Sequence, residues 1–510
     1  MITNHNLYDV LSQRFPVDGS KLCIINPASG DLSYSQLEQR SAQLANYFCS
    51  LGLIPGDRVA VQVKKSPQAL LVYLACLRAG FIYLPLNTGY TEAELQYFFS
   101  DANPGLIIAD PDGQAYCEPL AQQQSALFET LSSNGSGSLI DNSASFPQQF
   151  DNVVSRVNDL AAILYTSGTT GRPKGAMLSH GNLSANALML HDAWGWQQQD
   201  VLIHSLPIFH VHGLFVACHG VLAAGASMIF MPSFSVDEVI TQLPNATVMM
   251  GVPTFYTRLL ASDDFSAQHC AAMRLFISGS APLLATTHEA FQQRTGHRIL
   301  ERYGMSETSM LISNPLEGER RAGTVGFPLP GIDVRLVDAN TKSVAVGDVG
   351  SIQVKGPNVF QGYWQLPEKT AKEFTEDGFF ITGDQGMISD DGYISIVGRA
   401  KDMVISGGYN VYPKEVELVI DAIDGVKESA VFGIPDADFG EAVTVAIVVE
   451  AGVSFDVETI IASSREKLAA YKAPRFVHFL DQLPRNTMGK VQKNSLREKF
   501  SIVIPAKAEI

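Results

Sequence analysis

The stretch YTSGTTGRPKGAM, from Tyr165 to Met177, combines three glycines, three threonines, a serine and two cationic side chains in thirteen residues. Glycines let backbone N–H groups approach an anion closely, hydroxyls donate hydrogen bonds, and a lysine supplies charge. A short apolar run, AAILY, comes directly before it and is expected to be a strand. The pattern therefore predicts a phosphate-holding loop, with these groups as donors: Thr166, Ser167, Gly168, Thr169, Thr170 and Lys174.

The spacing within this loop argues against two common nucleotide-binding motifs. Pro173 stands five residues after Gly168, and Lys174 is followed by a glycine where a P-loop has serine or threonine. The sequence also has no GxGxxG after a predicted strand. A P-loop NTPase and a dinucleotide-binding fold are both disfavoured.

The elements around the loop alternate between helices and short apolar strands. A helix is predicted from Tyr34 to Leu51, and further strands are expected in VLIHSLP, SMIFMP, ATVMMGVP and MRLFISG. This alternation continues to about residue 310 and indicates α/β layers on largely parallel strands. The Gln/Ser-rich stretch 121–150 is interpreted as a surface excursion.

The pattern of predicted helices and strands changes twice towards the C-terminus. Residues 326–398 contain short strands between glycine turns, which predicts a small β-rich subdomain. The last hundred residues show a helix, two strands and another helix, which is typical of a compact α+β unit. We therefore expect an N-terminal domain over 1–398, a connection at 399–402 and a small C-terminal domain over 403–510.

Composition excludes several classes of protein. The 510 residues are 46% hydrophobic and carry a formal net charge of −16, which favours a folded protein and disfavours nucleic-acid binding. The six cysteines lie far apart without CxxC pairs, so reduced thiols are expected. The N-terminus lacks a signal-peptide pattern, and the two most apolar stretches are broken by charge, glycine and proline. A cytoplasmic protein without a membrane span is predicted.

The loop and six further strings resemble the adenylate-forming enzymes, the superfamily of acyl-CoA synthetases, luciferases and peptide-synthetase adenylation domains. The strings occur in the order expected for that family: PIFHVHG, SGSAPL, ERYGMSET, ITGD, GRAKDMVISGG and PRNTMGKVQK. The resemblance spans nearly the whole chain. It implies a large N-terminal α/β domain and a mobile C-terminal lid domain, and a reaction that joins a carboxylate to the α-phosphate of ATP before transfer to a thiol.

The resemblance also implies roles for single residues. Lys490 matches the lysine that bridges carboxylate and α-phosphate, Glu307 is expected to position Mg²⁺ with Thr166 nearby, and Lys401 is at the hinge position. His210 and His212 lie two apart, which on a strand would place both on one face as for a metal, but no third ligand is evident. The family suggests instead that His210 forms an aromatic wall beside the acyl group. The nucleotide-binding positions are matched by Ala281, Tyr303, Ser306, Asp384 and Arg399.

The acid is indicated by two arginines. A short dicarboxylate needs a cation for its second carboxylate, and the planar fork of arginine suits that purpose. Arg258 and Arg302 lie in strings that resemble the malonate-activating members of the family, although Ser306 replaces the usual threonine. We therefore expect malonate, ATP and CoA as substrates, with methylmalonate left open and a medium-chain or aromatic acid:CoA ligase as the alternative. A monomer or weak homodimer is expected.

Overall fold

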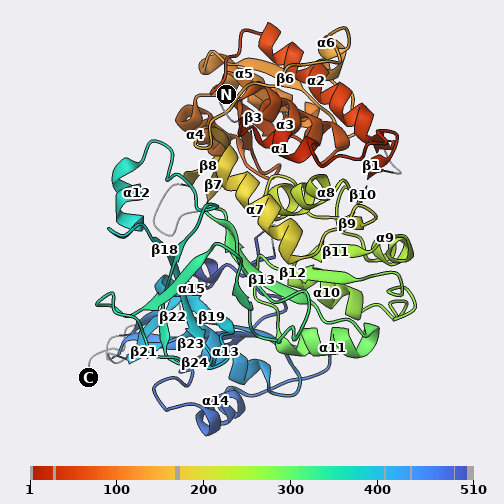
Figure 1. Cartoon of the computed structure of the whole chain (residues 1–510). Coiled ribbons are helices and arrows are strands. Elements are labelled where there is room, and N and C mark those ends of the chain that lie inside the picture. Colours follow the sequence, from red (N-terminus) through yellow and green to blue (C-terminus); the bar gives the residue numbers. More distant parts are fainter. Residues whose placement is uncertain are drawn as a thin grey trace. The chain divides into compact units, whose positions relative to one another are not determined.

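The computed structural model describes residues 4–26, 30–166, 173–406, 409–436, 439–486 and 489–501 (Figure 1). The chain divides into two compact units. The first comprises Met1–Asp333 with Val354–Phe380, and the second Val334–Gln353 with Ile381–Ile510.

Two sheets form the body of the first unit. One has six strands in the order β6-β5-β3-β4-β7-β8, all parallel except for the final β7–β8 pair. Their bounds are β3 Arg58–Gln62, β4 Ile82–Pro85, β5 Leu106–Ala109, β6 Leu127–Thr130, β7 Leu160–Thr166 and β8 Lys174–Ser179. The core beside this sheet includes Leu84, Phe98 and Ile107, all fully buried.

The second sheet has nine strands in the order β15-β14-β13-β12-β11-β9-β10-β1-β2. Its central strands are parallel, and β2, β14 and β15 are antiparallel to their neighbours. The bounds are β1 Leu22–Ile25, β2 Leu32–Ser33, β9 Val201–His204, β10 Ser227–Phe230, β11 Val248–Gly251, β12 Leu275–Ser278, β13 Leu300–Met305, β14 Ser309–Ser313 and β15 Phe327–Pro328.

Helices alternate with these strands, as the sequence predicts. In Figure 1, α10 and α11 lie side by side next to the green strands β11 and β12. The helices of the first unit are α1 Leu7–Ser12, α2 Tyr34–Ser50, α3 Pro67–Ala79, α4 Glu92–Ala102, α5 Gln114–Gln123, α6 Ser138–Ser143, α7 His180–Ala193, α8 His219–Ala224, α9 Val236–Gln242, α10 Pro253–Leu260, α11 Ala285–Thr295 and α12 Pro367–Glu373. A π-helical segment, η2, spans His212–Cys218.

The parallel register of the nine-stranded sheet gathers polar residues at one edge. Ser278, which ends β12, pairs with Gly251 of β11 and with Glu301 of β13. His204 and Phe230 are paired at the ends of β9 and β10. In open α/β sheets, ligands bind outside the carboxyl ends of the strands, so this edge is the expected position of a site.

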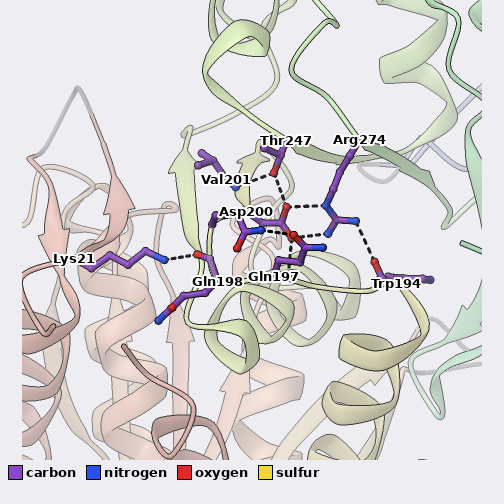
Figure 2. A network of polar contacts seen from close by, with 9 residues as sticks. Lys21, Trp194, Gln197, Gln198, Asp200, Val201, Thr247 and Arg274 are labelled. Carbon is purple, nitrogen blue, oxygen red and sulfur yellow. Dashed lines mark hydrogen bonds and ion pairs between the residues drawn. The ribbon is translucent and has the colours of Figure 1, made fainter. Parts of the chain in front are cut away.

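The opposite edge holds a buried ion pair that ties strand beginnings together. Asp200, directly before β9, accepts a hydrogen bond of 2.7 Å from Arg274 Nε and one of 2.8 Å from Thr247 Oγ1 (Figure 2). Thr247 precedes β11 and Arg274 precedes β12. Burial would raise the pKa of Asp200, but the hydrogen bonds from Arg274, Gln197 and Thr247 together hold that pKa below its usual value.

A four-stranded sheet in the order β16-β17-β18-β19 and a five-stranded sheet follow in the chain. In the five-stranded sheet, β21-β20-β23-β22 is extended by β24, which pairs with β23. The bounds are β16 Asp333–Val337, β17 Val349–Lys355, β18 Phe380–Ile388, β19 Ile394–Arg399, β20 Val404–Ser406, β21 Tyr409–Val411, β22 Val426–Asp436, β23 Gly440–Val449 and β24 Phe476–Phe479, with helices α13 Pro413–Asp421, α14 Val457–Lys467 and α15 Lys493–Ser501. The predicted domain boundaries at 398 and 402 stay predictions.

Most predicted elements are confirmed, and one interpretation is corrected. The helix expected over Tyr34–Leu51 is α2, and the strands in the five apolar strings are β7, β9, β10, β11 and β12. The stretch 121–150 is more than a surface excursion, because Leu127–Thr130 forms the edge strand β6 and its Glu129 is buried. Within the described residues, no helix combines the length and apolarity that a membrane span requires. The six cysteines are unpaired thiols.

Candidate active site

The two strands that flank the predicted phosphate loop form an antiparallel hairpin. Thr166, the last residue of β7, pairs with Lys174, the first residue of β8. The loop is therefore closed by two strands, whereas a P-loop leads from a strand into a helix. The predicted donors Ser167, Gly168, Thr169 and Thr170 lie outside the described residues.

Glu307 lies beside the loop end of this hairpin, in the turn between β13 and β14. Its carboxylate accepts a hydrogen bond of 3.4 Å from the Thr166 hydroxyl and one of 3.1 Å from the Tyr363 hydroxyl. Tyr363 reaches this position because its neighbour Trp364 donates a backbone hydrogen bond to Gly175 in β8. The arrangement brings together hard oxygen atoms from three separate parts of the chain.

Lys174 lies beside the same group. Its Nζ is 4.2 Å from the centre of the Tyr363 ring and 3.8 Å from Glu373. Burial lowers the pKa of Lys174, while Glu373 and Glu307 oppose that shift. Sequence reasoning missed Tyr363 and Glu373, because no local pattern singles out either residue.

The two histidines do not lie on a strand. His210 is in the loop after β9, and His212 begins the π-helical segment η2, so the shared strand face considered for a metal is wrong. In the described part of the chain, no cluster of three or more His, Cys, Asp or Glu side chains could hold a metal ion. Side chains two residues apart share a face only on a strand. The strand β9 ends at His204, so this rule does not apply to His210 and His212.

His210 lines a small cavity together with Ser306. Tyr165 and Phe209 line the same cavity. Desolvation lowers the pKa of His210 to about 4, so its imidazole is neutral at pH 7. Among the described residues, none hydrogen-bonds to its buried Nε2. A neutral ring with an unsatisfied nitrogen can contact a reacting group without adding positive charge.

Arg302 is a buried cation at the carboxyl edge of the nine-stranded sheet. Its side chain is 3% exposed, and within the described residues its Nε and Nη2 have no hydrogen-bond partner. Burial lowers the pKa of Arg302 to about 9, partly opposed by Tyr256 and Glu301, so the guanidinium is charged at pH 7. Two donor groups of a buried guanidinium are thus without a partner among the described residues, and such groups are costly to bury.

The positions of three further predicted residues, Arg258, Ala281 and Tyr303, say less about a ligand than the position of Arg302 does. Arg258 is exposed on α10, directly before the buried Leu259, while Arg302 is buried. Ala281 follows β12 and Tyr303 lies in β13, so both are at the carboxyl ends of neighbouring parallel strands. Both are partly exposed.

The second unit brings together another set of predicted residues. Asp384 in β18 pairs in register with Arg399 in β19, and Arg399 Nε lies 2.8 Å from the Asp384 carboxylate. Asp384 is buried. Lys490 is exposed when the whole residue is considered, but its ammonium group is desolvated. This desolvation lowers the pKa of Lys490 to about 8; the charge of Arg399 lowers the pKa further, and the charge of Asp384 raises it. Lys401, also exposed, lies in the short 3₁₀ turn η4, Ala400–Asp402.

Comparison with known proteins identifies the class. The family model described as AMP-binding enzyme matches residues 13–364, and the model described as AMP-binding enzyme C-terminal domain matches residues 415–490. The chain therefore belongs to the AMP-binding, adenylate-forming enzyme family, whose large N-terminal α/β and small C-terminal domains it shares.

Particular relatives are similar over nearly the full length. A probable CoA ligase of Humulus lupulus is 36% identical, with 92% of this chain and 84% of that protein aligned. A malonate–CoA ligase of Arabidopsis thaliana is 35% identical, with 88% and 79% aligned. The crystal structure of ATP-bound MatB from Rhodopseudomonas palustris superposes with a TM-score of 0.96 at 52% identity, covering 98% of this chain and 99% of that one.

Proposed function

We propose that this chain is an AMP-forming malonate–CoA ligase. It converts malonate, ATP and CoA to malonyl-CoA, AMP and pyrophosphate through malonyl-AMP. The family membership supports the ATP-dependent chemistry, and the Arabidopsis malonate–CoA ligase supports the acid. The observation that carries the choice of a dicarboxylate is Arg302, a buried guanidinium whose Nε and Nη2 lack hydrogen-bond partners among the described residues.

In the first half-reaction, one carboxylate oxygen of malonate attacks the α-phosphorus of ATP. The new oxygen–phosphorus bond forms malonyl-AMP, and the bond to pyrophosphate breaks. The second carboxylate of malonate pairs with Arg302, which holds the reacting carboxylate at a fixed distance inside the protein. Arg258, exposed on α10, is proposed to complete this grip from the more solvated side. His210, being neutral, borders the reacting carboxylate without competing for its charge.

Cations compensate for the charge of the two reacting anions. Lys174 and the loop from Ser167 to Thr170 are proposed to hold the phosphates, and Lys490 to bridge the attacking carboxylate and the α-phosphate. Asp384 and Arg399 form an ion pair, and we assign to them the ribose hydroxyls. Ala281, Tyr303 and Ser306 are assigned to the remaining nucleotide contacts. Lys401 is proposed as the hinge for movement of the lid domain between the half-reactions.

Mg²⁺ is proposed to accompany ATP. The carboxylate of Glu307 and the hydroxyl of Thr166 are 3.4 Å apart and are hard oxygen donors, which fits an ion that keeps several waters and substrate phosphate oxygens as ligands. When bound, the ion neutralises phosphate charge. In the second half-reaction, the CoA thiolate attacks the malonyl carbonyl carbon, and the bond to AMP breaks.

The test is substrate-dependent AMP formation by the purified protein with ATP, Mg²⁺ and CoA. We expect strong preference for malonate over acetate, octanoate and benzoate, with methylmalonate and succinate as graded probes of pocket size. Arg302→Ala is expected to remove this preference, and Arg298→Ala, an exposed arginine of the same unit, is expected to retain it. Preference for octanoate or benzoate that is indifferent to Arg302 would instead identify the alternative, a medium-chain or aromatic acid:CoA ligase.

A further inference from the structure

A partly buried lysine, Lys65, and a buried histidine, His204, lie outside the residues assigned above, and His204 precedes the segment that carries His210. Lys65 follows β3 in the six-stranded sheet, and His204 ends β9 in the nine-stranded sheet. Lys65 Nζ lies 2.8 Å from His204 Nδ1 and 2.7 Å from the His204 carbonyl oxygen. The contact thus joins the carboxyl ends of two strands from different sheets.

The Lys65 ammonium contacts two residues. It makes two hydrogen-bond contacts to His204, and the Phe230 ring centre lies 4.3 Å from Nζ, a cation–π distance. In the described part of the chain, no carboxylate forms an ion pair with Lys65. Burial lowers the pKa of Lys65 to about 7. A lysine so placed is costly to keep, which argues for a purpose beyond surface charge.

The other nitrogen of His204 closes a loop. Nε2 lies 2.8 Å from the Gly213 carbonyl oxygen, so the ring spans the base of the segment 205–212. Gly213 also packs against Pro207 so closely that a Cβ would lie 2.0 Å from the Pro207 carbonyl oxygen. The closed segment contains His210, which lines the cavity with Ser306.

The same segment reaches Arg302 through His212. His212 Nδ1 lies 3.2 Å from the hydroxyl of Ser280, and desolvation, then the charge of Arg302, lower the pKa of His212. The segment fixed by His204 therefore carries one histidine that lines the cavity and another that contacts Ser280 and lies within electrostatic range of Arg302. A displacement of its base would move both.

The chemistry of the contact determines the tautomer of His204. Below about pH 7, where Lys65 is protonated, its ammonium has only donors, so Nδ1 accepts from Lys65. Nε2 then carries the proton and donates to the Gly213 carbonyl. The opposite tautomer would direct Nδ1–H at the ammonium and leave two acceptors, Nε2 and the Gly213 oxygen, facing each other. Cys218 Sγ, 3.3 Å from Nε2, is compatible with the first tautomer as a weak acceptor.

We propose that Lys65 and His204 are positioning residues for the acid substrate: Lys65 selects the Nε2–H tautomer of His204, and that tautomer holds the segment 205–212 in its binding geometry. The inference rests on the proposed function, since it assigns the segment to malonate. Lys65 and His204 themselves do not touch the reacting atoms. Their substitution should therefore affect malonate more than ATP.

The first experiment is steady-state kinetics on Lys65→Met, His204→Gln and the double variant. We expect Lys65→Met to raise the KM for malonate about tenfold or more, a cost of about 1.4 kcal/mol, with a smaller change in the KM for ATP. Because Lys65 acts through His204, adding Lys65→Met to His204→Gln should cause little further loss. Lys64→Met is the matched control, since the neighbouring Lys64 is exposed and pairs with Asp112 at 2.6 Å.

The second experiment detects the tautomer by ¹⁵N NMR of histidine-labelled protein, with His204→Gln identifying the signal. The wild type should show His204 protonated at Nε2, and Lys65→Met should shift the population towards Nδ1–H. A wild-type ring protonated at Nδ1 would overturn the proposal even if the variants fail to fold. Additive kinetic losses, or equal losses for malonate and ATP, would overturn it too. If the wild type does not use malonate, the proposed function is wrong. The ¹⁵N NMR spectrum would still test whether Lys65 sets the tautomer of His204.

Discussion

The guanidinium of Arg302 occupies the space that a side chain at Gly279 would need. A Cβ built on Gly279 would lie 2.3 Å from Arg302 Cζ. The closeness follows from sheet register. Ser278 of β12 pairs with Glu301 of β13, so the residues that follow them, Gly279 and Arg302, lie next to each other. A glycine is required there for the arginine to lie flat against the backbone.

Gly279→Ala tests this packing. The added methyl should displace the Arg302 guanidinium and raise the KM for malonate by about tenfold or more, with the KM for ATP less affected. Gly89→Ala is the control, because a Cβ there meets only the Asn87 side chain at 3.4 Å. Steady-state kinetics with each substrate varied in turn gives the comparison. An unchanged KM for malonate in Gly279→Ala would contradict the role of Arg302.

Arg302→Met removes the charge and keeps much of the volume. The second carboxylate of malonate would then be desolvated without a partner, so kcat/KM for malonate should fall by about 100-fold or more. Arg258→Ala should have a smaller effect, since this exposed side chain is only weakly desolvated. Equal losses in both variants would show that the two arginines share the carboxylate equally.

Glu307→Gln tests the proposed magnesium site. Replacing the charged carboxylate by a neutral amide should weaken Mg²⁺ dependence, with about tenfold more Mg²⁺ needed for half-maximal rate and about a 100-fold lower kcat. Glu376→Gln, an exposed acid of the same unit, is the control. The measurement is pyrophosphate release against Mg²⁺ at constant ATP. A normal Mg²⁺ response in Glu307→Gln would exclude this residue from the site.

Lys490→Ala should separate the two half-reactions. Malonyl-AMP formation should fall by about 100-fold or more because a charge at the developing phosphorus is lost. Transfer from supplied malonyl-AMP to CoA should persist. Lys427→Ala, exposed in the same unit, should change neither step.

The pKa of Lys490 also predicts a pH profile. Desolvation and Arg399 lower that pKa to about 8, so the ammonium is present at pH 7 and is lost as pH rises through 8. In wild type, kcat/KM for ATP in the adenylation step should therefore decline above about pH 8. Lys490→Arg should retain its charge and lose this decline; a persistent decline would assign it to another group.

The Asp200–Arg274 pair is expected to govern stability and not catalysis. Asp200→Asn should lower the free energy of unfolding by about 3 kcal/mol, because Arg274 loses its buried partner. Lys64→Ala, at an exposed ion pair, should leave the unfolding midpoint unchanged. The network in Figure 2 contains Asp200, Thr247 and Arg274, which directly precede β9, β11 and β12. Chemical denaturation at pH 7 measures the difference.

The same pair gives a signed pH dependence. Since the pKa of Asp200 is held below its usual value in the fold, its stabilisation is complete above the unfolded value of about 4. It is lost as pH falls through the lower folded pKa. The stability gap between wild type and Asp200→Asn should therefore narrow in acid, and a constant gap down to pH 2 would contradict this assignment.

The sequence alone determined the class of chemistry and most of the elements. The loop around Thr166 and Lys174 predicted phosphate binding from composition, and alternating helix and strand patterns predicted the α/β layers, because hydrophobic periodicity is a local property. The misplacement of His210 and His212 on a strand arose where the chain continues from β9 through a loop into a π-helical segment.

Tertiary structure decided which of the candidate residues act together. Strand register places Gly279 against Arg302, and a pairing between β8 and the chain near Trp364 brings Tyr363 to Glu307. The contact of Lys65 with His204 joins residues 139 positions apart. Such contacts depend on the order of strands and on burial, neither of which is encoded in local spacing, and burial is also what distinguishes Arg302 from the exposed Arg258.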